Sequence, residues 1–163
     1  MRTVADRIAH LRPCADALEW ARDYTSPAKA WSECEHGDWM LWLLGQLSGV
    51  PESDARKLLV LAACDCADLA MPHAKTPVVA KCIKTARRWA KGKATIEQLR
   101  EARNDAAADA AYAAYAAADA AAAAAAAAYA ARKKTLATCA DIVRQHYPRP
   151  PVIKLPLDDE EDD

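Results

Sequence analysis

Apolar residues recur every three or four positions along most of this chain, which is the spacing of one face of an α-helix. Residues 39–47 are apolar on every side, which is typical of a helix at the centre of a domain. Since β-branched and aromatic residues form no run longer than residues 76–79, the pattern predicts an all-α fold. Two apolar stripes of this kind are Val4, Ile8 and Leu11, and Ala55, Leu59, Ala62, Cys66 and Leu69.

Capping residues mark where several helices begin. Ser26 places a capping hydroxyl directly before Pro27, which suits the first position of a helix. Gly37 is expected to end that helix, and Asp38 to cap the next. Thr95 forms a capping box with the glutamine three positions on, and this predicts the start of the last and longest helical segment.

The segment from residue 95 to about residue 146 contains neither Gly nor Pro. One straight helix of this length would reach roughly 80 Å at 1.5 Å per residue. A domain of this size has a radius of gyration of only about 15 Å. We therefore expect the helix to break, and Asn104-Asp105 and residues 132–134 are the weak candidates for the break.

Alanine dominates the middle of this segment, at 21 of the 27 residues from 105 to 131. Because alanine cannot fill space, a wide alanine face is useful where another backbone approaches closely. We expect a central helix with the bulky tryptophans packed over it, and a docking surface for a partner helix or a second copy is the alternative. The polar stripe of this helix, within about 80° of arc, comprises Asp105, Asp109, Tyr112 and Asp119.

Charge is unevenly distributed although the net charge is −1. Six of the 23 acidic residues are residues 158–163, so 17 remain against 22 basic residues and the body carries about +5. We predict a helical domain over residues 1–147, a single-domain bundle, and a Pro-rich, acidic, extended or disordered tail over residues 148–163. The sequence shows no signal peptide and no membrane span, and its six cysteines lack a Cys-x-x-Cys framework, which favours a cytoplasmic protein.

The polar turn between Trp31 and Trp39 is the densest group of reactive side chains, and Glu33, Glu35, His36 and Asp38 are its candidate partner-binding residues. Cys34 and His36 could form a nucleophile and its base, but positions two apart on a helix point about 200° apart. Cys34, His36 and Asp38 could bind a metal, but the second paired motif of a zinc site is absent. We therefore predict no catalytic residue, no metal and no cofactor, and a capping turn or partner contact.

A basic stripe follows at residues 81–91, where offsets of 0, 3, 7 and 10 put four cations on one side of a helix. Clustered cations are what phosphate binding needs. No helix-turn-helix and no interleaved aromatic pattern accompanies them, so a solvated helix face is the simpler interpretation. The four candidate residues are Lys81, Lys84, Arg88 and Lys91.

Residues 30–44, AWSECEHGDWMLWLL, resemble the hallmark stretch of a family of bacterial and phage proteins described as immunity proteins. The later order is similar too: a Leu/Ala/Cys-rich helix over residues 58–69, then TARRWAKGKAT at residues 85–95, then a long alanine tract. The resemblance covers about residues 31–131. It implies an all-helical protein that binds and neutralises a toxin, or a phage protein that blocks a host defence system, and it carries over no active-site residues.

The sequence thus favours a non-enzymatic, protein-binding inhibitor, toxin-immunity-like or anti-defence, that occludes a partner protein stoichiometrically. A nucleic-acid-associated protein that uses the basic stripe is one alternative. An oligomerising helical module is another, and it leaves a homo-oligomer open. We expect the partner to be a protein rather than nucleic acid or a membrane.

Overall fold

A computed structural model describes residues 2–69, 71–73, 77–117 and 125–154; for residues 73, 109–117 and 125–130 it describes the backbone alone. Within these residues the chain forms eight α-helices, two short 3-10 helices and no β-strand. The predicted all-α fold is therefore confirmed. None of the described helices is both long and apolar enough to cross a membrane.

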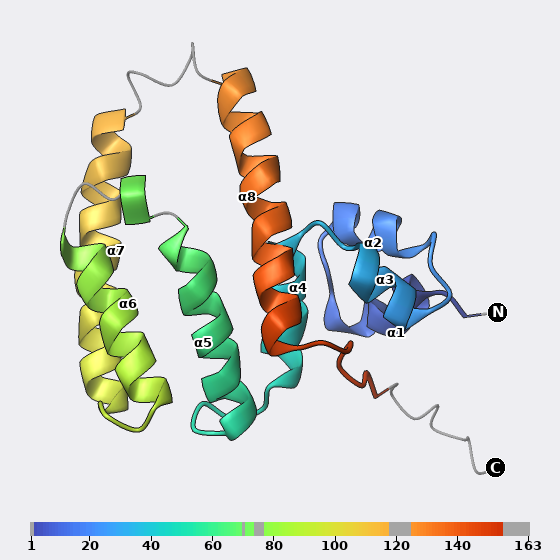
Figure 1. The fold of residues 1–163 in the computed structure, drawn as a ribbon, viewed down its shortest axis with the longest axis horizontal. Coiled ribbons are helices and arrows are strands. Elements are labelled where there is room, and N and C mark those ends of the chain that lie inside the picture. Colours follow the sequence, from blue (N-terminus) through green and yellow to red (C-terminus); the bar gives the residue numbers. More distant parts are fainter. Residues whose placement is uncertain (1, 70, 74–76, 118–124, 155–163) are drawn as a thin grey trace, which may run out of the picture.

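Three short helices come first and form a block at one end of the molecule (Figure 1). They are α1 (Val4–Ile8), α2 (Ala15–Ala21) and α3 (Pro27–Glu33), with the 3-10 helix η1 (Ala9–Leu11) after α1. The backbone N–H of Val4 donates to the carbonyl of Tyr24 at 2.7 Å. This bond ties the start of α1 to the turn that follows α2.

Five longer helices stand side by side next to this block (Figure 1). They are α4 (Gly37–Leu47), α5 (Asp54–Asp68), α6 (Pro77–Ala90), α7 (Ile96–Ala117) and α8 (Ala125–His146), with η2 (Met71–His73) between α5 and α6. Helix α6 packs between α5 and α7, and α8 returns to pack against α4 and α5. Helix α8 thereby brings the C-terminal part of the chain back to the N-terminal block.

The predicted helix starts are confirmed at two caps and wrong at one. The hydroxyl of Ser26 accepts the N–H of Lys29 at 3.3 Å, and the Thr95 capping box is present with bonds of 3.0 and 3.2 Å. Gly37 does not end a helix, because α3 already ends at Glu33 and Gly37 opens α4. Consequently Asp38 lies in the first turn of α4 and does not cap it.

The long segment after Thr95 is two helices, α7 and α8. Both candidate break points were wrong, since Asn104-Asp105 lies inside α7 and residues 132–134 lie inside α8. Neither contains Gly or Pro, and ordinary polar residues cost a helix too little to end it. Asp119 and the alanine side chains of residues 109–130 lie outside the described side chains, so the predicted packing of tryptophans over the alanine face stays a prediction.

The main core lies where α3, α4, α5 and α8 meet. Met40 and Leu44 are only 2% and 4% exposed, so α4 contributes to the core on this side, whereas Asp38 and Gln46 of the same helix are exposed. Helix α8 presents small residues to it: Cβ of Cys139 would lie 2.4 Å from a Cβ added to Gly37, and the backbone N of Ala140 2.7 Å. Glycine is therefore needed at position 37 for close approach of the two helices.

The segment after α8 closes the N-terminal block. The indole Nε1 of Trp31 donates to the carbonyl of Tyr147 at 2.9 Å. Beyond it, Pro150, Pro151 and Ile153 line an apolar groove together with tryptophans of α2, α3 and α4. Pro150, Pro151 and Ile153 thus lie against the helices, while residues 155–163, which include the acidic end, fall outside the described part of the chain.

The helix contact at Gly37 can be tested by adding one methyl group. Gly37→Ala should lower the free energy of unfolding by about 2 kcal/mol, because the neighbouring atoms at 2.4–2.7 Å are mostly backbone and cannot move aside. Gly45→Ala, in the same helix, is the control: its Cβ would meet only Leu59 at 3.9 Å and should be neutral or stabilising by up to about 1 kcal/mol. Urea denaturation measures both, and equal effects would mean that Gly37 is not a close contact.

Candidate functional site

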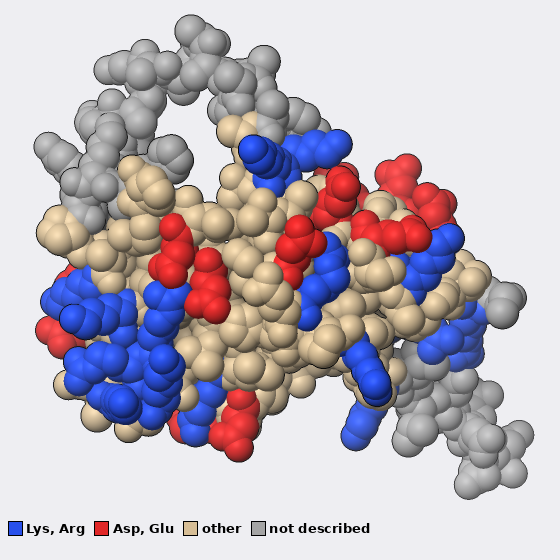
Figure 2. Space-filling model, viewed as in Figure 1, with Lys and Arg blue, Asp and Glu red and all other residues tan. Residues whose placement is uncertain are grey.

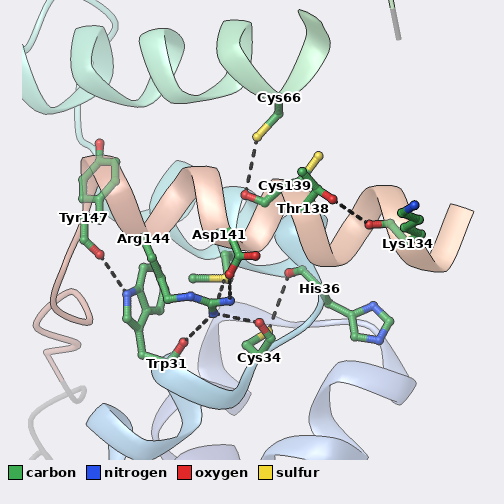
Figure 3. Close-up of polar contacts among 11 residues, drawn as sticks. Trp31, Cys34, His36, Cys66, Lys134, Thr138, Cys139, Asp141, Arg144 and Tyr147 are labelled. Carbon is green, nitrogen blue, oxygen red and sulfur yellow. Dashed lines mark hydrogen bonds and ion pairs between the residues drawn. The ribbon is translucent and has the colours of Figure 1, made fainter. Parts of the chain in front are cut away.

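The turn between α3 and α4 is held by Arg144, which reaches it from α8 (Figure 3). Its Nη1 donates to the carbonyls of Trp31 and Cys34 at 3.0 and 2.8 Å, and its Nη2 pairs with Asp141 at 2.8 Å. These carbonyls belong to the end of α3, where a helix leaves its carbonyls unpaired and its dipole favours a cation. One side chain therefore fixes the end of α3 and the path of the chain into α4.

A row of aromatic rings borders this turn. The His36 ring stacks on Trp39 with centroids 3.7 Å apart and planes within 9°. Trp39 lies 6.0 Å from Trp20, which lies 4.5 Å from Tyr24. In Figure 3 the His36 ring points away from Arg144. The braced side of the turn and its aromatic side are thus separate.

Carboxylates flank the rings. The Glu33 side chain is 48% exposed and only loosely paired with Lys29 at 3.9 Å, and Asp38 is 44% exposed, 3.7 Å from Nδ1 of His36. Glu35 is exposed and makes no ion pair with any described residue. Burial, with the Glu33 carboxylate next, raises the pKa of Tyr24. The acidic–aromatic patch, as we name it, consists of Glu33, Glu35, His36, Asp38, Trp39, Trp20 and Tyr24.

The structure does not assemble Cys34 and His36 as a nucleophile and base. The Cys34 thiol is 4% exposed, and its Sγ donates to the backbone carbonyl of His36 at 3.6 Å and not to the ring. Burial raises the pKa of Cys34, so the thiol stays protonated near neutral pH. In the part of the chain that the structure describes, no three His, Cys, Asp or Glu side chains are grouped so that they could hold a metal ion.

Of the four residues of the predicted basic stripe, the structure brings three together. Lys84, Arg88 and Lys91 line one groove of about 350 Å³. Lys81 instead turns toward α7, where it pairs with Asp105 at 3.3 Å. In Figure 2, Lys and Arg side chains gather at the lower left, over α6 and its turn into α7.

A second charged group joins α5, α6 and α8, and the sequence did not suggest it. Arg87 donates to Asp65 at 2.6 Å and to Asp68 at 2.5 Å, and Nε2 of His146 lies 2.8 Å from Asp65. Burial raises the pKa of Asp65, but the bonds and charges of Arg87 and His146 together outweigh it, and the pKa lies below its ordinary value. The partners are far apart in sequence, so no local spacing could have revealed them.

Comparisons of the chain with protein-family models, with curated proteins and with solved structures find no match in any of the three. The resemblance to the immunity proteins therefore stays a prediction. What the chain does is inferred from its own surfaces.

Replacing Arg144 tests whether its guanidinium holds the turn between α3 and α4. Arg144→Lys keeps the charge but cannot donate to both carbonyls and to Asp141 in one geometry. We expect amide hydrogen exchange over residues 33–38 to accelerate by about tenfold or more, equivalent to about 1.4 kcal/mol. Arg132→Lys, at an exposed position of the same helix, should leave it unchanged. Unaltered exchange in Arg144→Lys would show that the turn is held by other contacts.

Acidification should remove the contribution of Asp65 to the stability of the fold. Since its pKa is lowered on folding, the stability that it contributes is present above about pH 4 and is lost as pH falls through the lowered pKa. Asp65→Asn should therefore cost about 1 kcal/mol at pH 7, kept small by 43% exposure of the side chain, and almost nothing near pH 2. Denaturant titrations at both pH values check this, with Asp23→Asn on an exposed turn as control; a pH-independent cost would refute it.

Proposed function

We propose that this chain is a non-enzymatic, protein-binding inhibitor that docks its partner on the acidic–aromatic patch. The observation that carries the proposal is the bracing of the turn by Arg144 while its carboxylates stay exposed. A preorganised surface pays little ordering entropy on binding, which leaves more of the interaction energy as affinity. Rigid aromatic rings beside charges are also the typical anchors of protein interfaces.

The charge of the patch indicates the kind of partner. Three carboxylates flank the turn: Glu33 and Asp38 make ion pairs of 3.9 and 3.7 Å, with Glu33 also beside Tyr24, and Glu35 makes no ion pair with a described residue. A partner with a basic surface would satisfy them and would be steered toward them electrostatically. A toxin or host-defence enzyme with a basic substrate channel, occluded one to one, fits this description.

The cysteines are compatible with action in the cytoplasm. All six are free thiols, and four of them are buried. Thiols of this kind persist in a reducing compartment. We therefore place the inhibitor in the cytoplasm, and we propose no cofactor for it.

Charge reversal on the patch is the test of this proposal. Glu33→Lys and Glu35→Lys combined should abolish stoichiometric capture of the partner from the native host, a loss of at least about tenfold in affinity. The fold should be unaffected, because position 33 ends α3, where a cation is favourable, and position 35 is exposed.

The matched control is Glu52→Lys with Glu101→Lys, which makes the same change of charge at two exposed positions away from the patch. Capture should persist in the control. Equal capture by both doubles would remove the patch from the proposal. Absence of any one-to-one protein partner for the unmodified chain would remove the inhibitor itself.

A further inference from the structure

The groove beside α6 gathers cations that form no ion pair with a carboxylate of the described residues. Residues 77–95 contain six cations and no carboxylate. Lys81 is neutralised by Asp105, and Arg87 by Asp65 and Asp68. The other four pair with no carboxylate of the described chain, and all four line the same groove: Lys84, Arg88, Lys91 and Lys93.

The fourth cation is held in place by the end of α6. Gly92 adopts φ +68°, a left-handed conformation that suits glycine, and so turns the chain back. The N–H of Lys93 then donates to the carbonyl of Arg88 at 2.7 Å, and the Arg88 guanidinium donates to the carbonyl of Lys93 at 3.1 Å. This reciprocal pair fixes Lys93 beside the helix, next to the three cations that helical spacing already aligns.

The helix dipole accounts for only part of this arrangement. Cations near the end of α6 are favourable there, which explains Arg88 and Lys91. Lys84 lies in the middle of the helix and Lys93 lies beyond it. Four like charges around one hollow repel one another, and an anion in the hollow would relieve that repulsion.

The shape of the groove indicates a ligand with several phosphates in line. Lys84 and Lys91 are separated by seven residues, or about 10 Å along the helix axis. Phosphates of one strand of a duplex follow one another at roughly 3.4 Å along the axis, so this distance spans about three of them. Besides these cations the groove is lined by Met71, Ala80 and Ile83 and by the ion pair of Asp68 with Arg87, and no aromatic ring of a described residue lines it. Contacts would therefore go to the backbone and not to stacked bases.

We propose that this groove binds the sugar–phosphate backbone of a nucleic-acid strand, without sequence preference, through Lys84, Arg88, Lys91 and Lys93. The groove is lined by α6 and the turn after it, by Met71 of η2 and by Asp68 of α5, whereas the acidic–aromatic patch surrounds the α3–α4 turn. The binding is thus independent of the proposed inhibitor function, and either can fail alone.

Fluorescence anisotropy with a labelled 12-base-pair duplex and the full chain tests this proposal. We expect binding at about 50 mM salt. The logarithm of the association constant should fall linearly with the logarithm of the salt concentration. Lys84→Gln with Lys91→Gln should lower the affinity by at least about tenfold and reduce the salt slope by about 1.8, at about 0.9 for each lost phosphate contact.

The matched control is Lys133→Gln with Lys134→Gln, which removes two exposed cations of α8 and so changes the net charge equally. It should bind within about twofold of the unmodified chain. Equal losses in the two doubles, or no binding of the oligonucleotide at low salt, would overturn the proposal.

Two competitors of the labelled oligonucleotide distinguish which kind of anion the groove binds. A nucleoside triphosphate carries the same phosphates without a strand, and displacement by it at similar concentration would mean that the groove takes free nucleotides, against the strand proposed here. Polyglutamate carries the charge without phosphate. If polyglutamate displaces the oligonucleotide at equal charge concentration, the groove binds acidic protein and the proposal is wrong.

Discussion

The guanidinium of Arg144 reaches from α8 to two carbonyls at the end of α3, at 2.8 and 3.0 Å, and the position of the N-terminal block depends on this contact. A partly buried cation is costly unless its donors are satisfied, and here they meet two carbonyls and Asp141. Trp31 adds a second tie from the same helix to the carbonyl of Tyr147. The close approach of Gly37 to Cys139 then holds the start of α4 against α8. The contacts of Arg144, Trp31 and Gly37 therefore join the first three helices to the rest.

Local features of the fold could be predicted because local chemistry decides them. The caps at Ser26 and Thr95 satisfy backbone donors within three residues, and a helix with large apolar residues on most sides, such as α4, buries part of them in the core. Gly37 misled the sequence interpretation because glycine serves two purposes, helix ends and close approach, and the pattern alone does not separate them. The role of Arg144 could not be found at all, since the two carbonyls that it binds lie more than a hundred residues earlier.

In the candidate sites, too, some features follow from local sequence and others from contacts between distant helices. Helical spacing correctly aligned Lys84, Arg88 and Lys91, because one helix presents them. It could not show that α7 would pack against α6 and bring Asp105 to Lys81, which removes that cation from the group. The carboxylates of the α3–α4 turn were visible as a cluster, but their rigidity depends on α8. The acidic–aromatic patch and the basic groove thus lie on different elements of the fold.

The segment after α8 also packs against the N-terminal helices and helps to hold them in place. Pro150 and Pro151 lie against apolar side chains of α2, α3 and α4, and Ile153 packs against the cluster that contains Val4 and Ile8. Proline has no backbone N–H, so an extended segment rich in proline can cover an apolar groove without leaving donors unsatisfied. A hollow of only about 70 Å³ remains there. The rings of Trp20 and Trp39 that border the acidic–aromatic patch also line this groove, so the end of the described chain supports the patch from its inner side.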